Sequence, residues 1–331
     1  MNILIGGSLE SCTGQEELEI ANGIKTALVK QGHTVDSFML PFEPDFQAIP
    51  EQIAALQLFA LESTDLLITV GYPAMFLPHP RKSVYLLKTA PMAHEYWGTQ
   101  YGTLDNPSFY RIKVAIHEAE QKYLKQVRTI VCGSQLLQRD LIERYGISST
   151  VGYYPANMGV TGLDDDLSDS PYVVAESDLT PPSRMELLID TVKTSRGNWN
   201  LKWFVPNALN VYKDALIELI TKNSLQNRIQ VCSGQCTPVA MQKSVAYINL
   251  SYETHKIPSS FMRALACSTE VLIPRDSGAL LELAEGTFAP SPYEMSQALD
   301  NICQKPKTPQ QIHTDRTTSF DELAKRLVSG K

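Results

Sequence analysis

The chain contains 331 residues, and at about 150 residues per domain this length predicts two domains rather than one compact core. Hydrophobic residues make up 43% of the chain and charged residues 20%, which is typical of a folded globular protein and excludes a disordered chain. The 29 Lys and Arg residues against 36 Asp and Glu residues leave a net charge of −7, so non-specific binding to nucleic acid is disfavoured.

The first half of the chain alternates between short apolar runs and segments with helical spacing. Asn2–Ile5 predicts a strand, Gly6 and Gly7 a loop, and Glu16–Lys30 a helix. The alternation continues with predicted strands at 34–40, 65–70, 84–87 and 129–132 and predicted helices at 49–61, 109–125 and 135–145. Strands that alternate with helices predict a parallel sheet covered on both faces.

An acidic stretch without periodicity, NMGVTGLDDDLSDSP, predicts a linker. We therefore predict an N-terminal domain of residues 1–157, a linker of residues 158–171 and a C-terminal domain of residues 172–331. The alternation restarts with predicted strands at 172–175, 201–205, 228–232, 245–250 and 270–273, and predicted helices at 183–194, 211–222, from 238, 258–266 and after 278. Two doubly wound domains that face each other would enclose a ligand cleft beyond the carboxyl ends of their strands.

The sequence gives no sign of a membrane span or of a metal site. No apolar run approaches the ~18 residues of a transmembrane helix, and the opening MNILIGGSLES lacks the features of a signal peptide, so we expect a cytoplasmic protein. Cys232 and Cys236 are the only close pair of cysteines, and no second pair or neighbouring histidine completes a zinc site. We expect free thiols, no bound metal and no cofactor.

Several common catalytic motifs are missing. No GxGxxG motif follows the first strand, which disfavours a dehydrogenase, and the chain has neither a GxxxxGK[ST] phosphate loop nor a GxSxG nucleophile elbow. Gly6, Gly7 and the later Gly14 could serve a tight turn or contact a phosphate, and the residues alone leave both readings open.

Five segments, in order along residues 1–300, resemble the family-four glycosyltransferases of the GT-B fold. VYLLKTAPMAHEYWGTQYG resembles the pattern LLHQHRxxYDLWGTxYG, and YETHKIPSSFMRALACSTEVLIPRDSGALLEL resembles EGFGxPxxEAMACGxPVIxxDSGGxxEL. VVAESDLTPPSRMELLID takes the place of GRLxPxKRxELLI. The remaining two segments are TGQEELEIANGIKTALVKQGHTV, similar to the family's first loop and helix, and RTIVCGSQLLQRDLIERYGISSTVGYYP, similar to its strand, helix and entry to the linker.

The resemblance implies a fold and a function. It implies two Rossmann-like domains, and a C-terminal helix at Phe320–Val328 that crosses back towards the first domain. It also implies transfer of a sugar from a nucleotide-sugar donor to an acceptor that the sequence does not identify, with retention of configuration and without a metal. The nucleotide sugar would be a substrate rather than a cofactor.

The segment that holds the donor pyrophosphate in the family departs from the pattern here. Asp178 and Ser183 stand where the resembled family has an Arg and a Lys, so two cations are lost and an anion is gained. At an effective dielectric near 20, one unit charge about 5 Å from another is worth roughly 3 kcal/mol. Pyrophosphate binding therefore needs replacement cations, for which Arg184 and Arg275 are candidates.

The paired glutamates of the family are also altered. An alignment without a gap puts His255 at the first and Arg263 at the second, whereas a two-residue insertion would restore Glu253 to the first place. Arg263 is then a further candidate to bind the donor.

The remaining candidate residues follow from the same resemblance. Glu282 matches the closing acidic residue, Ser277 and Gly278 would present backbone N–H groups at a helix start, and Gly14 belongs to the first loop. Lys88 takes the place of a first-domain histidine, and His94 lies six residues further on. We take Lys88, His94 and Glu253 as catalytic candidates. The alternative readings of Lys88, Arg263 and His94 are a solvated charge for the first two and a packing residue for the third.

Two functions from different classes remain open. The first is a hexosyltransferase that binds a nucleotide sugar or nucleoside diphosphate. The second is a catalytically degenerate GT-B protein that binds a ligand or a partner subunit. An enzyme that acts on modified nucleic-acid bases is disfavoured by the acidic net charge.

Overall fold

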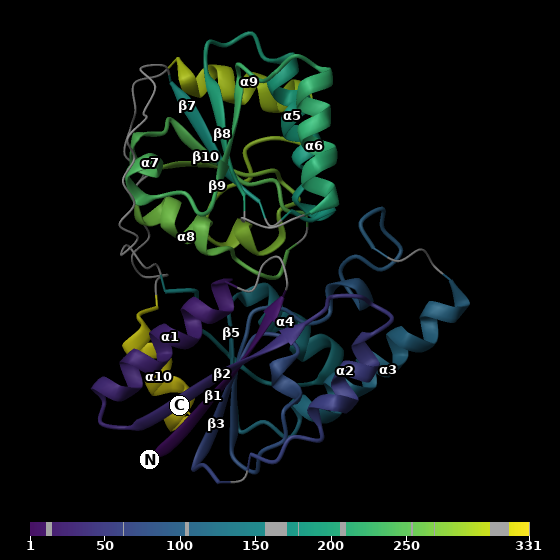
Figure 1. Ribbon diagram of the computed structural model, residues 1–331, viewed down its shortest axis with the longest axis vertical. Helices are drawn as coiled ribbons and strands as arrows, with labels where there is room; N and C mark the ends of the chain where they lie inside the picture. Colours follow the sequence, from purple (N-terminus) through teal and green to yellow (C-terminus); the bar gives the residue numbers. More distant parts are fainter. Residues whose placement is uncertain are drawn as a thin grey trace. The chain divides into compact units, whose positions relative to one another are not determined.

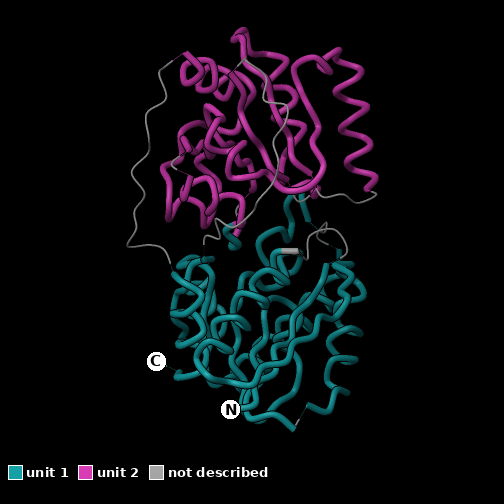
Figure 2. The backbone as a smooth tube through the Cα atoms, turned by 60° about the vertical axis from the view of Figure 1, so that its left-hand side comes forward, with its two compact units in different colours: residues 1–155, 255–257, 317–331 teal, residues 156–254, 258–316 magenta. Residues whose placement is uncertain are grey.

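The computed structural model describes residues 1–10, 15–61, 63–102, 106–155, 171–177, 179–205, 210–252, 254–267, 269–304 and 318–330. Within the chain, two compact units are distinguished (Figure 2). Unit 1 consists of residues 1–155, 255–257 and 317–331, and unit 2 of residues 156–254 and 258–316. The predicted linker, residues 158–171, falls almost entirely outside the described residues, so its limits stay a prediction.

Unit 1 contains a six-stranded parallel sheet in the order β2-β1-β3-β4-β5-β6. Its strands are β1 Asn2–Glu10, β2 Thr34–Phe42, β3 Leu66–Val70, β4 Lys82–Leu86, β5 Thr129–Cys132 and β6 Thr150–Val151. Its helices are α1 Gln15–Lys30, α2 Ile49–Leu56, α3 Pro107–Leu124, α4 Gln135–Tyr145 and α10 Phe320–Ser329, with short 3-10 helices η1 Ala74–Phe76 and η2 Pro91–Ala93.

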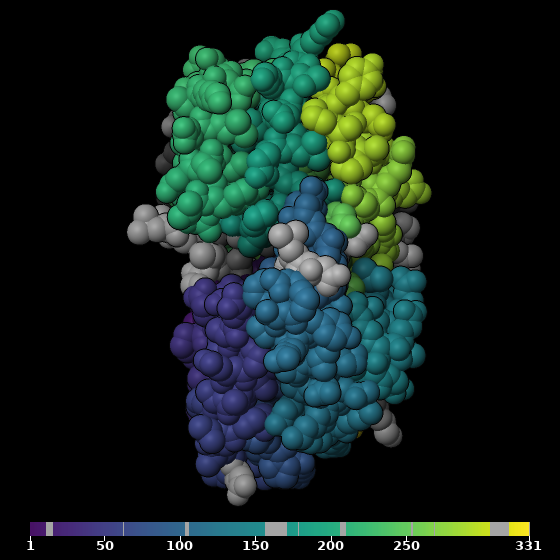
Figure 3. All heavy atoms as spheres, turned by 90° about the vertical axis from the view of Figure 1, so that its right-hand side faces the viewer, coloured from purple at the N-terminus to yellow at the C-terminus, as the bar shows by residue number. Residues whose placement is uncertain are grey.

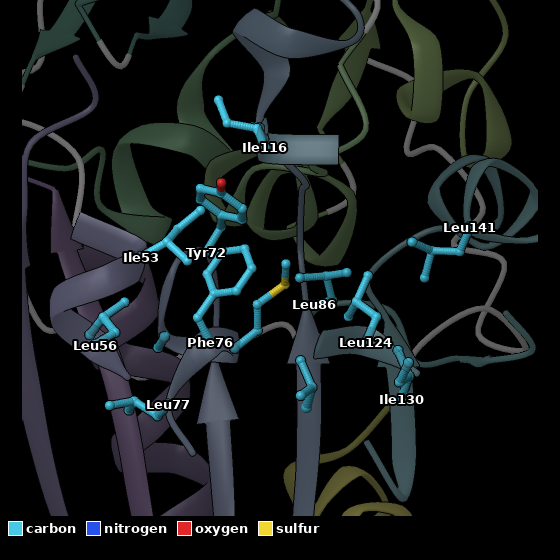
Figure 4. Close-up of a cluster of buried hydrophobic side chains, with 14 of the residues drawn as sticks. Ile53, Leu56, Tyr72, Phe76, Leu77, Leu86, Ile116, Leu124, Ile130 and Leu141 are labelled. Carbon is cyan, nitrogen blue, oxygen red and sulfur yellow. The ribbon is translucent and has the colours of Figure 1, made fainter. Parts of the chain in front are cut away.

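Helices cover both faces of this sheet. α1 and α10 pack together on one face, and α2 and α3 pack on the other with η1 (Figure 1). In Figure 3 the indigo residues of α2 border the blue residues of α3 on the surface of unit 1. The core on this second face is a cluster of aliphatic and aromatic side chains (Figure 4), including Ile53, Leu56, Tyr72, Phe76, Leu77, Leu86, Ile116, Leu124, Ile130 and Leu141.

The first strand differs from its prediction because it continues through both glycines. Gly6 and Gly7 lie inside β1, paired with Phe38 and Met39 of β2. A Cβ atom on Gly6 would lie 2.9 Å from Leu77 Cδ1, and one on Gly7 would lie 2.5 Å from Met39 Sδ. The two glycines therefore make room for neighbouring side chains within the sheet, and the loop that we predicted at these two positions was wrong.

Unit 2 contains a five-stranded parallel sheet in the order β11-β10-β7-β8-β9. Its strands are β7 Tyr172–Glu176, β8 Asn200–Val205, β9 Ile229–Ser233, β10 Ala246–Ile248 and β11 Glu270–Leu272. Its helices are α5 Met185–Thr194, α6 Val211–Lys222, α7 Pro238–Lys243, α8 Ser259–Ala266 and α9 Pro292–Cys303, with 3-10 helices η3 Pro181–Ser183 and η4 Gly278–Glu282. α5, α6 and α9 cover one face, and α7 and α8 the other (Figure 1).

The order of the strands in unit 2 creates a switch point. From β7 the chain passes outward to β8 and β9, and it then returns to β10 and β11 on the other side of β7. The connections that leave β7 and β10 therefore run to opposite faces of the sheet. In doubly wound sheets this place, outside the carboxyl ends of the two strands, is where ligands bind. The predicted α/β class with two parallel sheets is confirmed.

In the part of the chain that the structure describes, no helix combines the length and the apolar character needed to cross a membrane.

Candidate functional site

The candidate site of unit 2 lies at the carboxyl ends of β7, β10 and β11. The segment after β7 makes a tight turn in which the Ser177 hydroxyl donates to Ser183 Oγ at 3.0 Å and the Ser183 hydroxyl donates to the carbonyl oxygen of Thr180 at 2.6 Å. Ser183 therefore stabilises this turn. The turn ends at Arg184, whose φ of +53° is uncommon for a residue other than glycine.

Arg184 is held on three sides. Its Nε donates to the carbonyl oxygen of Leu250, which follows β10, at 2.5 Å. Its two terminal nitrogens donate to Asp276, which follows β11, at 2.7 and 2.9 Å. The ring of Tyr252 lies 5.5 Å from the guanidinium. The side chain is only 6% exposed, so the end of each of the three strands contributes to a single buried position.

Arg263 is held at the same edge of the sheet by a different carboxylate. It lies on α8, and its Nη2 donates to both oxygens of Glu176, the last residue of β7, at 3.1 Å. Its Nη1 donates to Gln235 Oε1 at 3.1 Å, and the backbone N–H of Cys236 donates to the same Glu176 carboxylate. Arg263 is 2% exposed, so it is not the solvated surface charge that we considered from the sequence.

The segment after β11 carries four further residues that the sequence predicts at a donor site. Arg275 is exposed and makes no ion pair within the described residues. Ser277 is fully buried, and its hydroxyl has no hydrogen-bond partner there. Gly278 and Glu282 are the first and last residues of η4, a five-residue 3-10 helix in which the N–H of Ala279 already donates to the carbonyl oxygen of Thr254.

The charges of this edge are therefore largely balanced. Arg184 and Arg263 each face one carboxylate, and Arg275 remains as an exposed cation. Buried arginine forks of this kind match carboxylate and phosphate geometry equally well. The arrangement could hold an anionic group, provided that an internal carboxylate gives way or that the anion binds beside Arg275.

Unit 1 places a second group of charges at the carboxyl end of its sheet. Lys88, after β4, pairs with Glu10 at the end of β1. Lys256 pairs with Glu16 at 2.6 Å and with Glu17 at 3.2 Å, at the start of α1. Burial raises the pKa of Glu17, although the charges of Lys256 and Lys88 oppose this. Burial alone would lower the pKa of Lys256, but the neighbouring glutamates outweigh it, and the pKa is raised.

His94 lies in a separate, buried network. Its Nε2 is 2.6 Å from Glu120 Oε2, and the hydroxyl of Tyr145 donates to the same oxygen at 2.5 Å. The N–H of Ala90 donates to the other oxygen of Glu120. Burial, together with the charge of Glu120, raises the pKa of Tyr145 above its ordinary value. The side chain of His94 is 4% exposed, and its contacts link the segment after β4 to α3 and α4.

His255 belongs to unit 1 and not to unit 2, which contains Arg184 and Arg263. Its Nδ1 lies 2.6 Å from Glu95 Oε1, and its Nε2 lies 3.8 Å from Asp140 Oδ2. Burial would raise the pKa of Glu95, but the hydrogen bond and charge of His255 outweigh burial and lower it. The carbonyl oxygen of His255 accepts from Ser134 Oγ at 2.7 Å.

Three sequence candidates, Gly14, Asp178 and Glu253, lie outside the described residues. The structure brings together Arg184, Arg263 and the residues after β11 at one sheet edge, while Lys88 and His94 lie in two separate clusters. Sequence reasoning missed Glu176, Asp276, Glu16 and Glu17 as charge partners. Their only signal in the sequence was an acidic side chain close to a predicted strand end or helix start.

Comparisons with known proteins give the fold. No model of a protein family matches the chain, and no curated protein sequence matches it. The solved structure of HepE from Anabaena in complex with UDP and glucose matches with a TM-score of 0.64 and 16% identity, covering 99% of this chain and 95% of that one. WaaG, a glycosyltransferase of lipopolysaccharide biosynthesis, matches with a TM-score of 0.63 and 11% identity over 100% of this chain and 96% of its own.

A glycosyltransferase from Rickettsia africae also matches, with a TM-score of 0.62 and 15% identity over 99% of this chain and 94% of that chain. These likenesses extend over nearly the whole chain. They confirm that the protein has the GT-B fold of glycosyltransferases, as the sequence resemblance implied.

Proposed function

We propose that the protein is a glycosyltransferase that moves a sugar from a nucleotide-sugar donor to an acceptor. The observation that carries this proposal is the set of groups at the β7/β10 switch point of a GT-B chain. The buried fork of Arg184 and the buried hydroxyl of Ser277 lie there, with Arg275 exposed beside them. The likeness to HepE, which was crystallised with UDP and glucose, supports a uridine nucleotide as the first donor to test.

Each donor-site residue has a role that its chemistry fits. A nucleoside diphosphate leaving group gains negative charge as the glycosidic bond breaks, so a fixed guanidinium lowers the energy of the transition state. Arg184 and Arg275 are the two cations that we assign to this charge. Ser277, Gly278 and Glu282 would line the same pocket, as the family resemblance implies. By the same resemblance we propose retention of configuration and no requirement for a metal.

The catalytic assignments in unit 1 differ in how well the geometry fits them. Lys88 lies at the carboxyl end of the first sheet and is partly exposed, so it can meet a ligand there. His94 is buried on Glu120 and Tyr145, which fits a packing and positioning role better than contact with a substrate. Glu253 stays a candidate on the resemblance alone.

The alternative, a GT-B protein that binds a nucleotide or a partner subunit without catalysis, also has an observation in its favour. Both Arg184 and Arg263 already face internal carboxylates, which reduces the positive charge available to a leaving diphosphate. A chain with this arrangement could bind a ligand weakly and transfer nothing.

One assay separates the two functions. Purified protein is incubated with a panel of nucleotide sugars, UDP-glucose among them, and release of nucleoside diphosphate is measured beside ligand binding. Turnover that falls about 10²–10³-fold in Arg275→Ala, but not in the exposed control Arg196→Ala, supports the transferase. Binding without release from any donor supports the degenerate protein. A folded chain that neither binds nor releases a nucleotide contradicts the transferase and the nucleotide-binding form of the degenerate protein.

A further inference from the structure

We propose that Asp276 is an internal competitor of the donor, and that donor binding requires its carboxylate to leave Arg184. This inference rests on the proposed function and assigns to Asp276 the control of donor affinity at that site. In this role Asp276 neither binds the sugar nor reacts with it. Its carboxylate occupies the position beside Arg184 that a donor phosphate group would take.

The hydrogen bonds of Arg184 identify the contested edge of its guanidinium. Nε is committed to the carbonyl oxygen of Leu250, and Nη1 and Nη2 form two parallel bonds with the two oxygens of Asp276. That parallel pair is the geometry in which an arginine binds either a carboxylate or a phosphate. Asp276 therefore occupies the edge that a donor phosphate would use.

The exposures of the two side chains show which partner faces solvent. The side chain of Arg184 is 6% exposed, whereas that of Asp276 is 32% exposed. An anion that arrives from solvent meets Asp276 before Arg184. The carboxylate accepts no other hydrogen bond within the described residues, so only its bond to Arg184 must be broken for it to turn outward.

The second buried arginine at this edge provides the contrast. Glu176 is 15% exposed, and it accepts hydrogen bonds from Arg263 and from the backbone N–H of Cys236. Displacement of Glu176 would break its hydrogen bond with the Cys236 N–H as well as its pair with Arg263, so an incoming phosphate would have to replace more interactions than at Arg184. Of the two pairs, Arg184–Asp276 is thus the one suited to exchange.

Arg184 itself would remain in place during the exchange. The carbonyl oxygen of Leu250 and the ring of Tyr252 hold the guanidinium from sides that Asp276 does not use. A fork that is already ordered loses little entropy when it takes a phosphate. In the free protein Asp276 keeps the buried guanidinium of Arg184 paired. Because the donor must displace this carboxylate, Asp276 lowers the affinity for the donor.

The test compares affinities by titration calorimetry for UDP, inorganic pyrophosphate and uridine, which carries no phosphate. Asp276→Asn keeps the size of the side chain and removes its charge, so we expect about tenfold tighter binding of UDP and pyrophosphate and no change for uridine. Glu285→Gln, an exposed carboxylate in the same unit, is the matched control for net charge and should change little. The gain from Asp276→Asn should vanish in an Arg184→Gln background.

Two results would overturn the inference alone. One is unchanged or weaker UDP binding by folded Asp276→Asn protein. The other, which needs no variant, is a structure of the wild-type protein with UDP in which the Arg184–Asp276 bonds are intact; the proposed function would survive both. If Asp276→Asn does not fold, this wild-type structure decides the question. No UDP binding by the wild-type protein or any variant overturns the inference and the proposed donor together.

Discussion

At the scale of single residues, the protein buries several charged groups, and Lys82 is an instructive case. It lies at the start of β4, and its ammonium group donates to the carbonyl oxygens of Met75 and Leu77 at 2.7 and 2.9 Å. No carboxylate pairs with it in the described part of the chain. Burial therefore lowers the pKa of Lys82 from 10.5 to about 8.

The lowered pKa of Lys82 predicts a pH dependence of stability. Between about pH 8 and pH 10.5 the unfolded chain holds the Lys82 proton more tightly than the folded chain, so this residue makes the free energy of unfolding rise with pH. In Lys82→Met that rise disappears. Urea unfolding of both proteins across this range checks the difference, and the exposed control Lys30→Met should keep the wild-type slope. Parallel curves for wild type and Lys82→Met would contradict the prediction.

The Arg263–Glu176 pair predicts a strong loss of stability when only one partner is removed. Glu176→Leu leaves the guanidinium of Arg263 buried without its carboxylate, which should cost about 3–5 kcal/mol. Adding Arg263→Met should recover much of that loss, because no buried charge then remains. Denaturant unfolding measures both. Removal of one partner from the exposed pair Lys30–Asp321 should lower the free energy of unfolding by less than about 1 kcal/mol. A loss as large as that of Glu176→Leu would contradict the explanation by burial.

At the scale of helices and strands, the packing of α1 against α10 constrains a residue that looks unfavourable in isolation. Gly23 lies in the middle of α1, where glycine costs about 1 kcal/mol relative to alanine. A Cβ atom there would lie 2.4 Å from the ring of Phe320, the first residue of α10. The glycine is therefore explained by the close approach of a helix from the other end of the chain.

A sign reversal tests this account. Gly23→Ala should destabilise the wild-type chain by about 1 kcal/mol, because overpacking by the new methyl group exceeds the gain in helix propensity. In a Phe320→Ala background the same substitution should stabilise by up to about 1 kcal/mol, since the clash is gone. Thermal unfolding of the four proteins completes the cycle. Stabilisation by Gly23→Ala in both backgrounds would show that the ring does not restrict this position.

At the scale of the whole molecule, the end of the chain completes the unit that contains its beginning. Leu323, Ala324 and Leu327 of α10 are fully buried in unit 1, and the hydroxyl of Ser83 in β4 donates to the carbonyl oxygen of Leu327 at 2.7 Å. Arg326 donates to the carbonyl oxygen of Val151 in β6. The last helix therefore covers strands that lie much earlier in the sequence.

Truncation after residue 316 should then damage one unit selectively. Loss of α10 exposes the apolar surface of α1, β4 and β5, so amide hydrogens in these elements should exchange at least tenfold faster. The slowly exchanging amide hydrogens of β7, β8 and β10 should keep their exchange rates, because α10 does not belong to unit 2. Hydrogen exchange with mass spectrometry measures both sets. Equal acceleration in the two sheets would contradict the assignment of α10 to unit 1.

The amino-acid sequence by itself determined the alternation of strands and helices, the parallel sheets and the basic residues that follow the strand ends. Apolar spacing is a local signal, and it predicts which residues face a core without any knowledge of the neighbours. The helix predicted after residue 278 is the five-residue 3-10 helix η4. The course of β1 through Gly6 and Gly7 escaped the local signal, because the side chains of Leu77, which follows η1, and of Met39 in β2 lie where a Cβ atom on these glycines would be.

Only the tertiary structure decided what the charged residues contact. Arg184 and Asp276 are 92 positions apart, and Glu176 and Arg263 are 87 positions apart. Each pair forms because the chain returns to place β10 beside β7, and β11 beside β10, on the side opposite β8, an order that local patterns do not encode. The sequence could therefore nominate Arg184 and Arg263 as anion-binding residues, whereas the arrangement of strand ends determined that each already has a carboxylate partner.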